Sequence, residues 1–155
     1  MIQQFKDFVF NRENRGKITL WVVGCLILGY LVVGVGQFVV LGFPDNPPVE
    51  YTVQWDSPRT EELWNRACRD CHSNETVWPW YSYVAPTSML VVYHVNEGRE
   101  SLNVSTDDVG EASDVGSQIR KDKMPPEQYI WLHPTAQLTD AEKDELIMGL
   151  LTTFR

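Results

Sequence analysis

The longest hydrophobic feature of the chain is an uninterrupted apolar run near its N-terminus. Residues 18–43 contain no Asp, Glu, Lys or Arg, and their only clearly polar side chains are Thr19 and Gln37. A helix of this length extends about 39 Å, which exceeds the ~30 Å hydrocarbon layer of a bilayer. The run is longer than the core of a signal peptide and ends without a small-residue cleavage site. We therefore predict an uncleaved transmembrane anchor over 18–43.

The residues on either side of this run predict its orientation in the membrane. The basic residues that precede it are Lys6, Arg12, Arg15 and Lys17. No Lys or Arg comes after it until Arg59, so the positive-inside rule predicts a cytoplasmic arm over 1–17 and export of the remainder. Three prolines between residues 44 and 48 stop the helix, which predicts an extended linker over 44–56 that holds the next domain off the bilayer.

The remaining residues, 57–155, show helical periodicity and no convincing alternating strand. Ser57-Pro58 followed by two acidic residues predicts a helix that runs to His72. A second helix is predicted from Pro86 to near Gly98, and a short amphipathic one over 109–119.

A capping box over 139–142 predicts the start of a terminal helix. Its expected apolar stripe consists of Leu146, Ile147, Leu150 and Leu151. Between the first two predicted helices lies a rigid aromatic loop, Trp78-Pro79-Trp80-Tyr81. The predicted fold class is all-α, with a single transmembrane helix followed by a small helical domain.

Composition and charge narrow the function classes. The 155 residues carry a formal charge of -8, and the part after residue 17 carries -10. Phosphate recognition depends on Lys and Arg, so this acidity excludes a nucleic-acid binder. The length allows one domain plus an appendage.

A short cysteine motif carries the predicted chemistry. Cys68-Arg69-Asp70-Cys71-His72 has the spacing of a c-type haem attachment site. Positions three apart share one face of a helical turn, so both thiols can reach the vinyl groups of one haem while His72 reaches the iron. Zinc binding, completed by His94 or His133, and a redox dithiol are the weaker alternatives.

An iron bound by His72 needs a sixth ligand or an open face. The candidates are Met89, His94, Met124, His133 and Met148. Met124 is favoured because it precedes two prolines, which mount its thioether on a stiff loop rather than on a helix. His133, which precedes a proline, is the second candidate and His94 the third. Met89 and Met148 are expected to pack in the core. Arg99 is a candidate partner for a haem propionate.

Several separated motifs occur in an order that resembles the bacterial haem-binding domain proteins of the cytochrome c type. These motifs are Cys68 to His72, Trp78 to Tyr81, Glu97-Gly98-Arg99, Met124-Pro125-Pro126 and His133-Pro134. The resemblance covers about residues 47–151. It implies a small, mostly helical monohaem domain, often membrane-anchored, in which Trp78, Trp80 and Tyr81 line the haem and Met124 is the axial methionine.

The expected function follows from the two axial ligands. Histidine and methionine together leave no open coordination site, which favours electron transfer over catalysis. The sequence thus predicts a membrane-anchored cytochrome with one covalent haem c, which carries electrons on the outer, periplasmic side of the cytoplasmic membrane. It would serve redox partner proteins of basic surface or act as a subunit of a respiratory or photosynthetic complex. The alternatives are a haem enzyme or a gas or redox sensor with an open or labile distal site, and a structural subunit.

Overall fold

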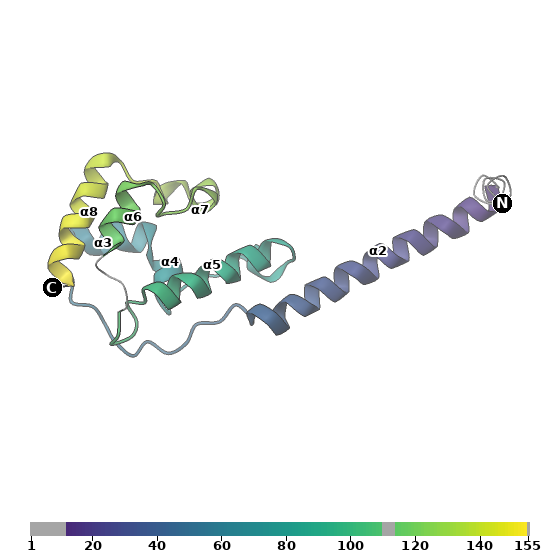
Figure 1. Cartoon of the computed structure of the whole chain (residues 1–155), viewed down its shortest axis with the longest axis horizontal. Coiled ribbons are helices and arrows are strands. Elements are labelled where there is room, and N and C mark those ends of the chain that lie inside the picture. Colours follow the sequence, from purple (N-terminus) through teal and green to yellow (C-terminus); the bar gives the residue numbers. More distant parts are fainter. Residues whose placement is uncertain (1–11, 110–113, 155) are drawn as a thin grey trace.

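The computed structural model describes residues 12–109 and 114–154, and these form a mostly helical protein (Figure 1). No strand occurs among them, which confirms the predicted fold class. The elements, in chain order, are α2 (Arg12–Leu41), α3 (Pro58–Ala67), α4 (Arg69–His72), η1 (Trp80–Tyr83), α5 (Thr87–Ser101), α6 (Val115–Arg120), α7 (Glu127–Leu132), η3 (Pro134–Ala136) and α8 (Asp140–Thr153).

Helix α2 extends away from the helical domain (Figure 1). Its segment Asn14–Leu41 is long and apolar enough to cross a membrane, and its most hydrophobic window is not buried against the rest of the protein. The predicted helix over 18–43 is therefore present, although it ends at Leu41. Gly42 follows at φ 80°, a left-handed conformation that suits glycine and leads the chain out of the helix. Most of the predicted arm, residues 1–11, lies outside the described part of the chain.

The linker after α2 is extended, but it does not hold the domain at a distance. Its backbone N–H groups at Glu50 and Tyr51 both donate to the carbonyl of Ser105, and Val53 is buried in the core. Helix α2 itself touches the domain through Tyr30, whose hydroxyl donates to the carbonyl of Ala85. These contacts bind the linker and α2 directly to the domain, and the linker bounds of 44–56 stay a prediction.

The first predicted helix of the domain is two helices. Ser57 caps α3, accepting from the N–H of Thr60, and Pro58 occupies the first turn. The helix ends at Ala67, because Cys68 adopts φ -124° and ψ -35° and begins a new turn. The carbonyl of Cys68 then accepts from the N–H groups of Cys71 and His72, at 3.2 and 3.1 Å. The break lets the cysteine motif leave the axis of α3.

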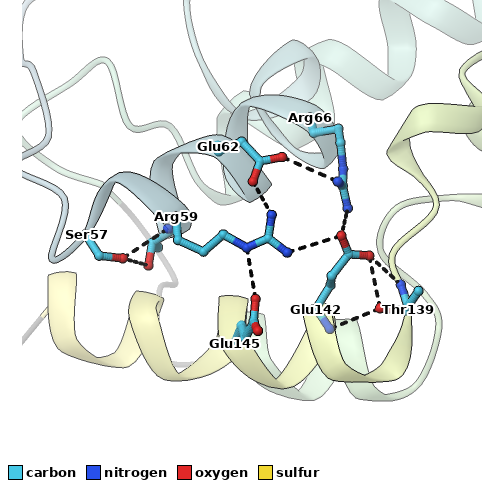
Figure 2. Close-up of polar contacts among 8 residues, drawn as sticks. Ser57, Arg59, Glu62, Arg66, Thr139, Glu142 and Glu145 are labelled. Atoms are coloured by element: carbon cyan, nitrogen blue, oxygen red, sulfur yellow. Dashed lines mark hydrogen bonds and ion pairs between the residues drawn. The ribbon is translucent and has the colours of Figure 1, made fainter.

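Helices α3 and α8 pack side by side and are joined by a network of charges (Figure 2). Arg59 donates to Glu62, Glu142 and Glu145, and Arg66 bonds Glu142 at 2.6 Å. Figure 2 also shows the predicted capping box, in which Thr139 and Glu142 bond reciprocally at the start of α8. This network fixes the two helices that carry most of the core.

The core lies between α3, α6, α8 and the segment after α5. Its buried apolar residues include Leu63, Trp64, Leu102, Val104, Ile119, Leu146, Ile147 and Leu150. Three of the four predicted stripe positions of α8 are therefore buried, whereas Leu151 is exposed. Met89 and Met148 are also exposed, so their expected core packing was wrong.

Two further differences concern short helices. The predicted helix over 109–119 is confirmed only as α6, which begins at Val115, and residues 110–113 lie outside the described part. Helix α7 and the turn η3 were not predicted, since Glu127–Leu132 is only six residues long and buries no side chain completely. Such a segment leaves no hydrophobic periodicity to detect.

Candidate functional site

The cysteine motif forms a single turn at the wall of a cavity. Cys68, Cys71 and His72 all line a cavity of about 370 Å³. The two thiols are not joined in a disulfide. Burial raises the pKa of Cys68 to about 12 and that of Cys71 to about 11, so both groups are neutral thiols at physiological pH. The turn thus presents two thiols and one imidazole to the same space.

The imidazole of His72 is held in one orientation by two backbone carbonyls. Its Nδ1 lies 3.0 Å from the oxygen of Gly98 and 3.0 Å from that of Leu102. Both partners are acceptors, so Nδ1 carries the proton and Nε2 keeps its lone pair. Burial lowers the pKa of His72, which also favours this neutral form. A metal-binding histidine is commonly oriented by such a carbonyl contact.

Glycine at position 98 makes this arrangement possible. A Cβ atom there would lie 2.4 Å from the carbonyl oxygen of Cys71 and 3.0 Å from its carbonyl carbon. Helix α5 therefore approaches α4 more closely than any other residue at this position would permit. The close approach brings the Gly98 carbonyl to His72.

Met124 lies in the wall of the same cavity, although it is 52 positions from His72 in the sequence. Its side chain is half-buried and packs against the core. Its backbone N–H donates to the carbonyl of Gln118 at 3.4 Å, which ties the segment to the end of α6. The structure thus brings together the four residues predicted to hold the haem and its iron.

A second cavity of about 290 Å³ adjoins the first. Residues that line both include Asp70, Cys71, His94 and Tyr129. Tyr81 lines this second, mainly apolar space, as does His133. The His133 ring stacks on Tyr129 at 4.2 Å between centroids, and its Nδ1 lies 3.1 Å from the Tyr129 carbonyl. Of the two alternative sixth ligands, only His94 also lines the cavity of His72.

The other predicted cofactor contacts lie elsewhere. Trp80 is 77% exposed, and neither Trp80 nor Trp78 lines either cavity. The guanidinium of Arg99 lies over the Trp78 ring at 5.8 Å and also lines neither cavity. Its N–H groups donate at 2.8 to 2.9 Å to Ser73, Asp45, Asn46 and Thr76. Arg99 and Trp78 thus fasten the linker to the segment after His72.

Trp64 is a site residue that the sequence reasoning missed. It lines the cavity of His72, and its Nε1–H is buried without a hydrogen-bond partner among the described residues. A buried donor of this kind requires an acceptor. Its position four residues before Cys68, one turn of α3 away, is the signal that could have identified it.

Tyr129 and Asp70 form a second contact that was not predicted. The Tyr129 hydroxyl donates to Oδ2 of Asp70 at 2.8 Å, while Oδ1 accepts from the N–H of Val77 at 3.1 Å. Burial, and then the charge of Asp70, raises the pKa of Tyr129. The carboxylate inside the cysteine motif therefore joins the attachment turn to α7.

The alternatives for the cysteine pair find no support. No three His, Cys, Asp or Glu side chains converge on a metal position among the described residues, as a zinc site would require. The same part of the chain has no strand, and so lacks the βαβ unit of a thioredoxin-like dithiol.

Comparison with known families supports haem binding. The sequence model of the haem-binding domain family matches residues 31–151. The chain belongs to this haem-binding family. No curated protein and no solved structure shows significant similarity to it. The cavity of this family member fits the cofactor, because it combines an oriented imidazole, two thiols, a thioether and the unpartnered Trp64 N–H.

Proposed function

We propose that this haem-binding protein is a membrane-anchored c-type cytochrome that carries electrons on the outer side of the cytoplasmic membrane. Cys68 and Cys71 would hold one haem through two thioether bonds. His72, through Nε2, and Met124 would be the axial ligands. The observation that carries the proposal is that one cavity is lined by both thiols, the oriented imidazole and the Met124 side chain.

Covalent attachment of the haem would need no reactant other than the haem and the two thiols. The thiols of Cys68 and Cys71 would each add across one vinyl group, with the sulfur bonding one vinyl carbon and the thiol hydrogen going to the other. The cofactor supplies one-electron chemistry when bound. The chain's own contribution is to hold Nδ1–H of His72 against Gly98 and Leu102, and to offer the Trp64 N–H to a haem carboxylate.

An electron carrier fits this site better than a catalyst does. With His72 and Met124 both bound to it, the iron would have no open position for substrate, and its potential would be higher than with two imidazole ligands. The walls around the site are mainly apolar, as the second cavity shows most clearly through Leu90, Val91 and Val95. An apolar wall limits the reorganisation of water when the iron changes charge.

Two observations support retention of α2 as the anchor. The family match begins at residue 31, inside α2, so the sequence model of the family includes the second part of this helix. Tyr30, Gln37 and Leu41 of α2 also form hydrogen bonds with the domain. A signal peptide is cleaved off, so it would form no such contacts in the mature protein. Basic residues before α2 support a cytoplasmic N-terminus.

The acidity of the part beyond residue 17 supports redox partners with a basic surface. Its formal charge of -10 would steer association with such a partner. Electron transfer to a basic acceptor is expected to slow as ionic strength rises, measured by stopped-flow mixing of the reduced protein. A rate that rises with salt would contradict a basic partner.

The spectrum of the purified holoprotein tests the proposal. We expect a ferric methionine-to-iron charge-transfer band and no carbon monoxide binding by the reduced protein. Met124→Ala should abolish the band and admit carbon monoxide, whereas Met148→Ala, at an exposed position of α8, should change neither. Absence of the band from the unmodified protein, together with carbon monoxide binding gained in His94→Ala or His133→Ala but not in Met124→Ala, would reassign the ligand. Carbon monoxide binding by the unmodified protein would favour the enzyme or sensor.

Mass spectrometry tests the covalent attachment separately. The denatured chain should carry the mass of one porphyrin, and Cys68→Ala with Cys71→Ala should remove it. An unmodified chain that still binds haem would refute the c-type attachment while leaving the haem-binding assignment intact.

A further inference from the structure

The turn η1 and the first half of α5 present an apolar surface that no part of the described chain covers. Its exposed side chains, which we call the aromatic tip, are Trp80, Tyr83, Val84, Met89 and Tyr93. None of them lines either cavity at the haem site. The tip belongs to a segment, 76–96, that contains no Asp, Glu, Lys or Arg over 21 residues. An exposed surface of this kind marks an interaction site.

Helix α2 fixes the level of this tip relative to a bilayer. Ala85 accepts from the Tyr30 hydroxyl at 2.9 Å, and the Ser88 hydroxyl donates to Gln37 at 2.8 Å. Further along, Asn96 donates to the Leu41 carbonyl at 3.0 Å. Figure 1 shows the same arrangement, with the start of α5 beside the second half of α2. Helix α5 thus points its N-terminal end towards the middle of α2.

The rise of about 1.5 Å per residue in an α-helix gives the depth of each of these contacts in the membrane. Gln37 lies about 6 Å and Tyr30 about 16 Å before Leu41. The 28 residues of Asn14–Leu41 extend about 42 Å, so a centred span exceeds the ~30 Å hydrocarbon layer by about 6 Å at each end. Ser88 is then level with the outer edge of the hydrocarbon, and Ala85 is level with its outer part.

The polar groups nearest to α2 are suited to such a place. The Ala85 carbonyl, which follows the irregular turn η1, is satisfied by the Tyr30 hydroxyl, and Ser88 is paired with a buried Gln37. Backbone that leaves regular helix inside a bilayer must find partners within the protein. Trp and Tyr, three of the five tip residues, are the side chains enriched at the membrane interface.

We propose that the aromatic tip inserts into the outer leaflet of the lipid bilayer, and this inference rests on the proposed retention of α2 as a span. The occupant of the surface is lipid, because α2 holds the first part of the tip at hydrocarbon level and its α5 residues at the interface, and no charged side chain of the segment 76–96 opposes insertion. Helix α5 then acts as a rigid spacer between lipid and haem site. Gly98, which bonds His72, lies ten residues beyond Ser88, about 15 Å along the helix.

Photo-crosslinking of the full chain in vesicles of phosphatidylethanolamine and phosphatidylglycerol tests the insertion. A benzophenone amino acid is placed singly at Trp80, Met89, Met148 or Trp21, and lipid adducts are quantified by mass spectrometry. Met148 is the matched control, because it is also an exposed helical methionine and, at 62% against 39%, is the more exposed of the two. Trp21, in the first half of α2, reports on the anchor itself.

We expect lipid adducts at Trp21, Trp80 and Met89, with a yield at Met89 several-fold above that at Met148. Adducts at Trp21 alone would overturn the insertion of the tip while leaving the anchor in place. No adduct at Trp21 would refute the anchor. Crosslinks from Met89 to a second chain instead of lipid would show that another copy covers the tip, and would also overturn the proposal. If the Trp80 variant fails to fold, Met89 decides the outcome.

Discussion

Replacement of Gly98 by alanine tests how the protein holds the proposed iron ligand. The added Cβ would lie 2.4 Å from the Cys71 carbonyl oxygen, where ordinary contact begins at 3.4 Å. The oxygen belongs to the backbone and the Cβ is fixed rigidly to the backbone of α5, so α5 must move about 1 Å away from α4. Such overpacking costs about 1–3 kcal/mol, and the better helix propensity of alanine returns about 1 kcal/mol. We expect a net loss of up to about 2 kcal/mol in the free energy of unfolding.

The same displacement should weaken the contact that orients His72. A shift of about 1 Å would take the Nδ1 to Gly98 oxygen distance, 3.0 Å in this structure, beyond hydrogen-bonding range. The bond to Leu102 would then hold the ring alone. We therefore expect a smaller haem-loaded fraction in Gly98→Ala, in addition to the lower stability.

Two assays follow these effects in the detergent-solubilised full chain. Urea unfolding monitored by circular dichroism gives the stability, and the pyridine haemochrome assay gives the haem content per chain. Gly116→Ala is the control, since its Cβ would meet only the Ile147 side chain, at 3.1 Å from Cγ2, an atom that can yield. If Gly98→Ala matches Gly116→Ala in both assays, the close approach of α5 to α4 does not position His72.

Three further predictions concern the contacts around the site. Tyr129→Phe removes the 2.8 Å bond to Asp70 and should lower the free energy of unfolding by about 1–3 kcal/mol in urea titrations; an unchanged midpoint would contradict it. The N-cap backbone N–H lowers the pKa of Glu142 to about 2, so its contribution to stability is complete above about pH 4.5 and lost towards pH 2. In Glu142→Gln, the free energy of unfolding should therefore fall less between about pH 4.5 and pH 2 than in the unmodified protein, as measured by urea titrations at several pH values. An equally steep fall in both proteins would refute this. Gly149→Ala should destabilise the protein, because its Cβ meets the Thr60 side chain, and Thr60→Ala should partly restore the thermal midpoint; no restoration would place the clash elsewhere.

The features that the sequence determined by itself are local. The apolar span, the cap at Ser57 and the capping box before α8 all depend on residues within about one turn of each other. The Cys68 to His72 motif is local in the same sense, because a single turn places its thiols and imidazole on one cavity wall. Such features depend on contacts between residues three and four positions apart, so the local sequence is sufficient to predict them.

The sequence predicted less well where a side chain's role depends on what lies opposite. Trp80 and Arg99 carry the residue types of a haem pocket, yet Trp80 is exposed and Arg99 binds the linker. Met148 and Leu151 follow the periodicity of α8, but no neighbouring helix of the described chain covers them. Residue type and period give the face of a helix, and only the packing of other elements decides whether that face is buried.

Only the tertiary structure decided which distant residues meet at the site. It places Met124 in the cavity of His72, brings the Gly98 and Leu102 carbonyls to the imidazole, and leaves the Trp64 N–H without a partner among the described residues. These pairings depend on how closely α5 and α6 approach the attachment turn. Close-packing of side chains and backbone sets those distances, and they cannot be predicted from the spacing of residues along the chain.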